Sequence, residues 1–263
     1  MPSPNLRVYL AALSFIFFSS LTTTSSYAEK TTIAVASNFS HAMNSIVTHF
    51  ETVSDHEITL VFGSSGKLFA QIHNSAPFDA FFSADAQKPQ VLIESNKALR
   101  NSHFTYAIGA LVLWSEDNKV DSLNLLRNNT FKKLAIANSR LAPYGLAAAE
   151  VLDNLNLSET VKQKLVTGEN ISQTFQFVKS GNAQLGFIAK SQLRSESHQH
   201  ESKHRENTAN IWHVPAELHK PIRQNAVLLR RGAHNIATLA FLEYMKSDEA
   251  KKIIRHAGYS LPK

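Results

Sequence analysis

The sequence predicts an α/β fold in which mostly parallel strands are flanked by helices. Short runs of β-branched and aromatic residues alternate with segments whose apolar residues recur at helical spacing. The first three strand-like runs, at residues 31–37, 57–62 and 78–84, are separated by two helical segments. This order is typical of a parallel sheet with helices on both faces. With 263 residues, 43% of them hydrophobic, the chain can bury the core of one or two domains.

The N-terminus has the parts of a secretory signal peptide. A basic residue, Arg7, precedes the apolar run at residues 8–21, and small residues follow at Ser26 and Ala28. The alternative is a membrane anchor, but this run is shorter than the span of about 20 residues that an anchor needs. We therefore expect residues 1–28 to be removed on export and the mature protein to be periplasmic.

The mature chain continues the alternation of strands and helices. The first helix is expected at residues 39–50 and the second at residues 68–72. Asp79 and Asp85 bracket the third strand and are expected to cap or end it. Further strands are expected at residues 104–115, 132–139, 183–189 and 225–231. Further helices are expected at residues 143–155, 171–181, 237–247 and 248–258, with Gly181 as a C-cap.

Charge and cysteine content exclude several classes of protein. The chain has no cysteine, which excludes a disulfide framework and a thiolate metal site. Its net charge of +6 comes from scattered lysines and arginines, so no nucleic-acid partner is expected. Residues 195–207 carry three histidines without a clear set of carboxylate partners, so an exposed loop is expected here rather than a metal site.

Four turns share one design, because each precedes a predicted helix and the first three also follow a predicted strand. They lie at residues 36–40, 63–66, 142–145 and 169–172. In open α/β sheets, ligands lie beyond the carboxyl ends of the strands, where helices begin. The first N–H groups of a helix are unpaired and carry partial positive charge, so converging helix ends can hold an anion. Ser and Asn are also good N-caps, so capping remains the alternative at each turn.

Catalytic and nucleotide-binding motifs fit less well. Residues 63–66 lack the G-x-S-x-G spacing of a hydrolase, and the chain has no glycine motif for phosphate or dinucleotide binding. His41 and His73 sit on helical segments without an evident acid partner. We therefore expect no enzyme activity, and an exported hydrolase that uses Ser64 or Ser65 is the alternative from a different class.

The residues of these turns resemble a known family. ASNFSHAM at residues 36–43 and GSSG-x-x-x-x-QI-x-x-x-AP-x-D-x-FFSAD at residues 63–85 are similar to the periplasmic molybdate-binding proteins of ABC importers. The resemblance continues to the C-terminal helix. It implies a two-lobed type II periplasmic binding protein whose lobes, each a mostly parallel sheet flanked by helices, are joined by two crossover strands. Lobe one would comprise residues 29–108 and 223–263, and lobe two residues 109–222.

The resemblance also implies a function and a set of site residues. The protein would capture molybdate, or tungstate, between its lobes and deliver it to an inner-membrane ABC permease, without a cofactor. The oxyanion would be bound by Ser37, Asn38, Ser65, Tyr144 and Ile171. Ser65 would contribute its hydroxyl and backbone N–H, Ile171 would contribute its backbone N–H, and molybdenum would have no direct protein ligand. Some members have a tyrosine where this chain has Ala189, so one hydroxyl is missing here. A monomer is expected, and sulfate, phosphate or a phosphonate is the alternative ligand.

The residue types suit a fully ionised oxyanion. Molybdate near neutral pH is a tetrahedral dianion that accepts hydrogen bonds and donates none, so its site should consist of donors. A carboxylate in contact with the ion would repel it. The first three turns contain no Asp or Glu, and Glu169 of the fourth is expected to point away from the ion. Because the donors come from both lobes, the bound ion would favour a closed state.

Overall fold

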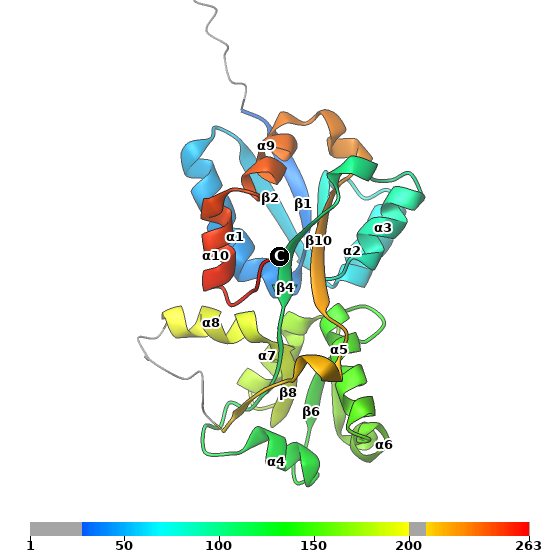
Figure 1. Cartoon of the computed structure of the whole chain (residues 1–263), viewed down its shortest axis with the longest axis vertical. Helices are drawn as coiled ribbons and strands as arrows, with labels where there is room; N and C mark the ends of the chain where they lie inside the picture. Colours follow the sequence, from blue (N-terminus) through cyan, green and yellow to red (C-terminus); the bar gives the residue numbers. More distant parts are fainter. Residues whose placement is uncertain (1–27, 200–208, 263) are drawn as a thin grey trace, which may run out of the picture.

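The chain forms two lobes, each built on a five-stranded sheet (Figure 1). The structure is a computed structural model that describes residues 28–199 and 209–262. The strand order is β2-β1-β3-β10-β4 in the first sheet and β7-β6-β8-β5-β9 in the second. The predicted two-lobed α/β fold is confirmed. The predicted signal peptide lies, apart from its last residue, outside the described residues.

The first sheet has a parallel half and an antiparallel half. β1 pairs in parallel with β2 and β3, whereas β10 is antiparallel to β3 and β4. These strands are β1 (Lys30–Ala36), β2 (Glu57–Gly63), β3 (Ala80–Ser83), β4 (Phe104–Gly109) and β10 (Ile222–Leu228). The pairing places the carboxyl ends of β1, β2 and β3 at the same edge of the sheet.

Helices cover both faces of the first sheet, as predicted. One face packs against α1 (Ser40–Val53), α9 (Ile236–Tyr244) and α10 (Asp248–His256), and the other against α2 (Ser65–His73) and α3 (Gln87–Glu94). Within β1, Ile33 and Val35 face the first group and Ala34 faces the second, since successive side chains of a strand point to opposite faces.

The second sheet repeats this plan. β6 pairs in parallel with β7 and β8, and β5 is antiparallel to β8 and β9. The strands are β5 (Leu111–Trp114), β6 (Leu134–Ala137), β7 (Leu165–Gly168), β8 (Leu185–Ala189) and β9 (Ile211–His213). The helices are α4 (Ser122–Arg127), α5 (Pro143–Asn154), α6 (Ser158–Val161), α7 (Ile171–Lys179) and α8 (Lys190–Gln199). α5 packs on one face of the sheet and α7 on the other.

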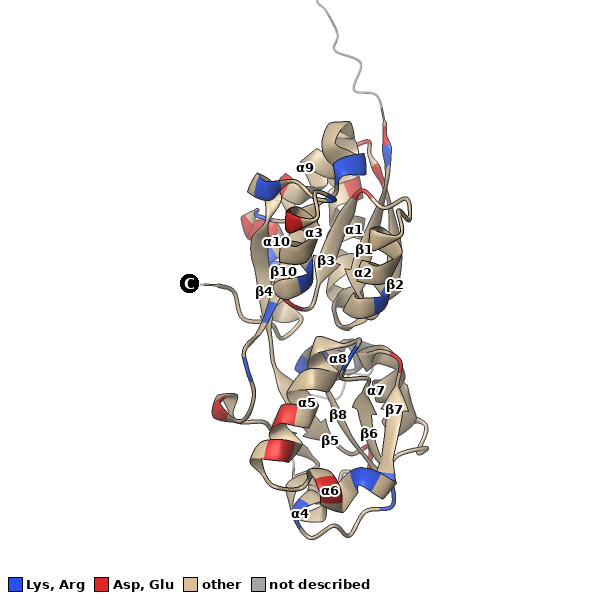
Figure 2. Cartoon of the chain, turned by 90° about the vertical axis from the view of Figure 1, so that its right-hand side faces the viewer, with Lys and Arg blue, Asp and Glu red and all other residues tan. Residues whose placement is uncertain are grey.

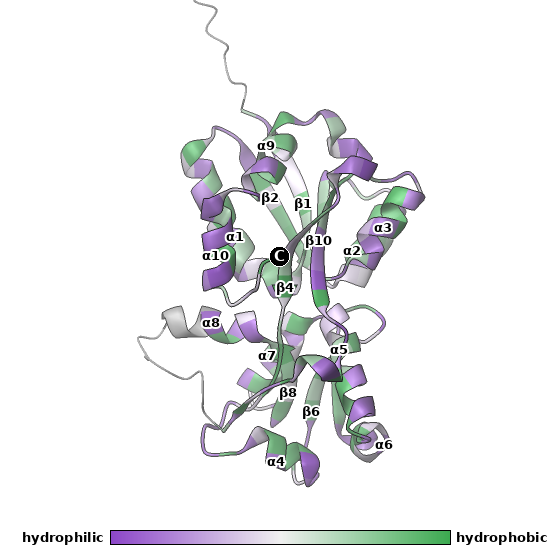
Figure 3. Ribbon diagram, viewed as in Figure 1, coloured by the Kyte–Doolittle hydropathy of each residue, from purple (hydrophilic) through white to green (hydrophobic). Residues whose placement is uncertain are grey.

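Short 3₁₀ helices complete the secondary structure. They are η1 (Ser37–Phe39), η2 (Arg100–Ser102), η3 (Lys162–Lys164), η4 (Ala216–Leu218) and η5 (Arg230–His234). η1 joins β1 directly to α1, so it lies at the carboxyl edge of the first sheet. Figure 3 shows hydrophobic residues gathered on the sheets and on the helix faces that cover them.

The structure departs from the sequence-based expectations in several segments. The elements α3, α4, α6, β7 and β9 were not expected, and the late strand expected at residues 225–231 is observed at Ile222–Leu228. The expected strand at residues 104–115 is interrupted at Ala110, where the chain leaves the first sheet as β4 and enters the second as β5. The expected loop at residues 195–207 is wrong for residues 195–199, which continue α8. This end of α8 lacks an apolar period, which is why its helix was not predicted. Residues 200–208 are outside the described part of the chain.

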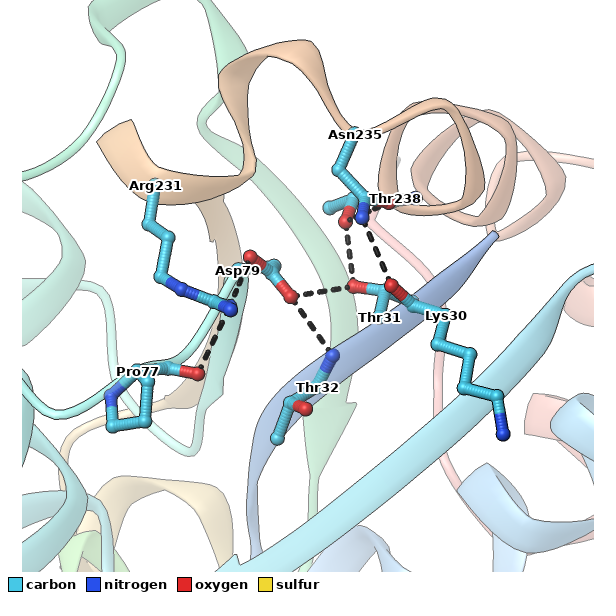
Figure 4. A network of polar contacts seen from close by, with 8 residues as sticks. All are labelled: Lys30, Thr31, Thr32, Pro77, Asp79, Arg231, Asn235 and Thr238. Carbon is cyan, nitrogen blue, oxygen red and sulfur yellow. Dashed lines mark hydrogen bonds and ion pairs between the residues drawn. The ribbon is translucent and has the colours of Figure 1, made fainter. Parts of the chain in front are cut away.

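Asp79 fastens the end of lobe one that lies away from the second sheet (Figure 4). Its buried carboxylate accepts hydrogen bonds from the backbone N–H of Thr32 at 2.9 Å and from the Thr31 hydroxyl at 3.1 Å. Its other oxygen pairs with Arg231 at 2.6 Å. Asp79 thus precedes β3 as expected, and its partners tie this strand to β1 and to η5.

The charged residues are dispersed over the surface of both lobes (Figure 2). Seven of the nine ion pairs recorded among the described residues involve a lysine that is more than 40% exposed, as in Lys30–Glu57 and Lys162–Glu159. Exposed pairs of this kind contribute little to stability. Among the described helices, none is both long enough and apolar enough to span a bilayer.

Candidate functional site

The carboxyl edges of the two sheets meet at the junction between the lobes. The backbone N–H of Gly66, in the second residue of α2, donates a hydrogen bond of 2.7 Å to the carbonyl of Leu141, which follows β6. The Ser172 hydroxyl, near the start of α7, donates one of 3.1 Å to the Ser37 carbonyl, which follows β1. The four turns singled out in the sequence therefore lie together, two from each lobe.

Gly66 is required for this close approach. A Cβ at this position would lie 2.9 Å from both the Cα and the carbonyl oxygen of Leu141. These are backbone atoms, which cannot move aside as the end of a flexible side chain can. The two lobes are thus in direct backbone contact, and the structure shows them closed.

An ion pair marks the exposed edge of the junction. Lys67 of α2 and Glu169, just before α7, lie 2.9 Å apart, and their side chains are about half exposed. Glu169 therefore pairs with a cation of the opposite lobe at the surface. This arrangement agrees with the expectation that its carboxylate points away from the buried part of the junction.

All five residues predicted to bind an anion are buried at this junction. Ser65 and Tyr144 are 1% exposed, Ile171 3%, and Ser37 and Asn38 5%. Ser37 is linked to the start of α7 through Ser172, whereas Asn38 and Tyr144 share one buried partner, described below. Ser65 precedes Gly66, whose partner Leu141 is three residues before Tyr144.

Capping and the candidate donors fall on different residues. Ser64 is the N-cap of α2 and accepts a hydrogen bond from the backbone N–H of Lys67 at 3.3 Å, and Asn170 caps α7 in the same way. Ser65 and Ile171 are the first residues of these helices, and their backbone N–H groups have no partner among the described residues. The capping alternative therefore holds for Ser64 and Asn170.

The Ser65 hydroxyl is oriented by the protein. Its oxygen accepts a hydrogen bond of 2.9 Å from the backbone N–H of Ala84, just after β3. Because this bond uses the oxygen as the acceptor, the hydroxyl hydrogen remains to be donated. Ser65 thus offers two donors, its hydroxyl and its backbone N–H, at the N-terminus of α2.

The side-chain amide of Asn38 is engaged within the protein. Its amide nitrogen donates to the side-chain oxygen of Gln224 at 2.7 Å and to the Tyr259 hydroxyl at 3.1 Å. Both amide hydrogens are therefore used within the protein. Asn38 can therefore contact an anion only through its backbone N–H. The hydrogen bonds of its side chain hold that backbone in place.

The side chain of Tyr144 is buried, and its hydroxyl is neutral. Its oxygen accepts a hydrogen bond of 3.3 Å from the Gln224 amide nitrogen. Burial raises the pKa of Tyr144 well above its usual value, and the neighbouring Tyr259 and Tyr106 raise it further. The hydroxyl hydrogen is consequently retained at any physiological pH.

Three residues near the site were not predicted from the sequence, namely Gln224, Tyr106 and Tyr259. They come from β10, from β4 and from the segment after α10, and each is buried. The Tyr259 hydroxyl donates to the Asn38 carbonyl at 2.6 Å. No short motif surrounds these residues, so only the hydrogen-bond demand of buried polar groups could have drawn attention to them.

The fully buried polar residues of the junction are neutral and rich in hydrogen-bond donors. Its polar groups are the hydroxyls and amides of Ser37, Asn38, Ser65, Tyr106, Tyr144, Ser191, Gln192, Gln224 and Tyr259. The N-termini of α2 and α7 add partial positive charge from two directions. The described residues contain no cluster of His, Asp or Glu of the kind that binds a metal cation. This arrangement can stabilise an anion through neutral donors.

Comparisons with known proteins agree on one family. Residues 31–260 match the family described as "Bacterial extracellular solute-binding protein". The chain is 42% identical over 231 residues to the molybdate-binding protein ModA of Azotobacter vinelandii, covering 87% of this chain and 89% of that protein. It is also 42% identical over 227 residues to ModA of Rhodobacter capsulatus, covering 86% of each.

Two solved structures have a similar fold. The periplasmic molybdate-binding protein of Azotobacter vinelandii superposes with a TM-score of 0.81 at 34% identity, over 89% of this chain and 100% of that one. The sulfate-binding protein SubI of Mycobacterium tuberculosis shares the fold, with a TM-score of 0.72 at 11% identity, over 89% and 87% of the two chains.

Proposed function

This chain belongs to the bacterial extracellular solute-binding proteins and, within them, to the ModA group, and we propose that it captures molybdate and delivers it to an ABC permease. The observation that carries this proposal is the buried junction between the lobes, where neutral hydroxyls and amides lie together with free helix N–H groups. The two relatives at 42% identity are named as molybdate-binding proteins.

The proposed ligand set contains the five residues predicted from the sequence. Ser65 would donate its hydroxyl and backbone N–H, Tyr144 its hydroxyl, and Ile171 its backbone N–H. Ser37 and Asn38 complete the set from lobe one, with the backbone N–H of Asn38 as its donor. Hydrogen bonds to a charged group are worth about 1.5–3 kcal/mol each, so several of them on rigid turns can compensate for dehydration of the ion. Molybdenum itself would have no protein ligand.

We further propose that the ion drives closure. Ser37, Asn38 and Ser65 lie at the first sheet, and Tyr144 and Ile171 at the second. Only the closed state brings both sets of donors to one ion, so binding shifts the population toward that state. The closed protein would then dock on the permease.

We assign residues 29–108 and 223–263 to lobe one and residues 109–222 to lobe two. The passage of the chain between the sheets after Gly109 and before Ile222 supports this division. Residues 1–28 would act as the signal peptide that exports the protein to the periplasm, where we propose that it works as a monomer.

The test is calorimetric titration of the purified mature protein with molybdate, tungstate, sulfate and phosphate. We expect tight binding of molybdate and no heat from sulfate at the same concentration. Molybdate should also raise the melting temperature, since a ligand that binds only the folded state stabilises it. Saturable binding of sulfate or phosphate without binding of molybdate would replace the proposed ligand.

A further inference from the structure

Gln224 lies where the strand β10 passes between the lobes. It is fully buried, and the pairing of β10 with β4 shifts by one residue between Gln224 and Asn225. The unpaired extra residue of this bulge is Tyr106 of β4, so it is β4 that bends beside Gln224. β10 pairs with β3 only from Asn225 onward, so Gln224 lies just outside the part of the strand that is held on both sides.

The side chain of Gln224 connects both lobes. Its oxygen accepts hydrogen bonds from the Asn38 amide at 2.7 Å and from the Tyr106 hydroxyl at 3.1 Å, both from lobe one. Its nitrogen donates to the Tyr144 hydroxyl of lobe two at 3.3 Å. A single amide therefore holds one candidate ligand residue from each lobe.

The chemistry of an amide determines the direction of these bonds. An NH₂ group can only donate, so the Tyr144 oxygen must accept from it and the Tyr144 hydrogen must point elsewhere. The amide oxygen of Gln224 can only accept, so it holds the Asn38 amide as a donor. The network is neutral, and it leaves the Tyr144 hydrogen for an acceptor outside the network.

The atoms packed around the hydrogen-bonded side chains of Gln224 and Tyr144 restrict their movement. A Cβ on Gly109 would lie 2.1 Å from the Tyr144 hydroxyl oxygen and 3.0 Å from the Gln224 nitrogen, so the backbone of β4 lies directly against the pair. On the other side, the Phe39 ring packs edge-on against Tyr106 at a centroid distance of 4.8 Å.

We propose that Gln224 is a positioning residue that turns the Tyr144 hydroxyl hydrogen toward the bound oxyanion and couples this donor to Asn38 across the lobes. The inference rests on the proposed function, because Tyr144 acts as a ligand donor only if an anion occupies the junction. Gln224 itself would not contact the ion.

The test is a double-mutant cycle on molybdate affinity, measured by calorimetry. Gln224→Met keeps the length of the side chain and removes both polar atoms. We expect it to weaken binding about tenfold in the wild-type background, the loss typical of one oriented hydrogen bond to a charged group. In the Tyr144→Phe background, the same substitution should cost clearly less affinity, because the hydroxyl is absent and only the hydrogen bond to Asn38 remains to be lost. A role limited to general stability would give the same loss in both backgrounds.

A matched control separates stability from positioning. Thr238→Val removes a buried hydroxyl in the Asp79 network of lobe one, away from the junction. It should lower the melting temperature and leave molybdate affinity unchanged. If Gln224→Met does not fold, Gln224→Asn replaces it in the cycle, because it keeps an amide but shortens its reach.

The outcomes are distinguishable from a failure of the proposed function. Molybdate binding by the wild type, with equal losses in both backgrounds or no loss at all, would overturn the role of Gln224 alone. Absence of molybdate binding by the wild type would overturn the proposed function together with this inference. A loss in the wild-type background that is clearly smaller with Tyr144→Phe would support both.

Discussion

The backbone N–H of Gly66 donates a 2.7 Å hydrogen bond to the carbonyl of Leu141 across the junction between the lobes. Gly66 is the second residue of helix α2 in the first lobe, and Leu141 follows strand β6 in the second lobe. The contact can form only when the lobes close, and it leaves no space for a side chain at position 66. The same turn presents Ser65 to the junction, so closure and donor placement depend on the same few atoms.

Gly66→Ala should therefore impair closure. The added methyl group would lie 2.9 Å from the Leu141 backbone, and we expect molybdate affinity to fall by about ten- to a hundredfold, or roughly 1.4–2.8 kcal/mol. Small-angle scattering should show that saturating ligand no longer compacts the protein fully. Gly63→Ala is the control in the same turn, since its methyl group would meet only the Leu68 side chain, at 3.2 Å. Equal affinity in the two variants would contradict a role for the backbone contact.

Ser64 and Ser65 should respond differently to alanine. Ser65→Ala removes a hydroxyl donor and should weaken molybdate binding about tenfold or more. Ser64→Ala removes the N-cap of α2 and should cost about 1 kcal/mol of stability, with less than a threefold change in affinity. Thermal unfolding and calorimetry on both variants give the comparison. Covalent labelling of either serine by a fluorophosphonate probe would instead favour the exported hydrolase.

Alkaline pH should destabilise the protein through its buried tyrosines. Burial raises the pKa of Tyr259 from 10.0 to about 12, and the pKa of Tyr144 is raised as well. Because these groups lose their protons more readily in the unfolded chain, their contribution to stability is complete below pH 10 and is lost as the pH rises toward 12. Denaturant unfolding between pH 8 and pH 11 measures this loss, and Tyr259→Phe should reduce it. Molybdate affinity should stay constant from pH 7 to pH 9, where Tyr144 keeps its hydrogen.

Asp79→Ala should affect stability and spare binding. The substitution removes the acceptor of the Thr32 N–H, one of the two partners of the Thr31 hydroxyl and the ion-pair partner of Arg231. We expect a loss of about 1–3 kcal/mol, the range for leaving a buried donor unsatisfied. Arg231 should add little, since its side chain is more than half exposed and gains solvation. Urea denaturation measures the loss, while the affinity for molybdate should remain within a factor of two. A large drop in affinity would show that this network reaches the junction.

The elements with a local signal were predictable from the sequence. The strands β1, β2, β3, β6 and β8 carry continuous apolar runs, and α5 and α7 carry helical periodicity, so their positions follow from side-chain pattern alone. Gly181 was predicted as the C-cap of α7, but Ser180 holds that position, and Gly181 follows it with a φ of 74°, the conformation typical of glycine just past a helix end. The first three turns were found for the same reason, because each lies where a strand period gives way to a helical one.

Other features depend on contacts between distant segments. Gln224 lies 186 residues after Asn38 and 80 after Tyr144, and nothing in its own neighbourhood indicates that it joins them. The break at Ala110 is likewise invisible locally, because β4 and β5 are both apolar and only their partners show that they belong to different sheets. The engagement of both Asn38 amide hydrogens also depends on Gln224 and Tyr259, which the turn motif does not contain.

The most direct test of the central claim is a crystal structure of the mature protein grown with molybdate, with the ion located by anomalous scattering from molybdenum. We predict an ion between the lobes, with the Ser65 hydroxyl, the Tyr144 hydroxyl and the Ile171 N–H within hydrogen-bonding distance of its oxygens. An ion at another place, or one held mainly by lysine and arginine side chains, would contradict the claim that neutral donors bind it.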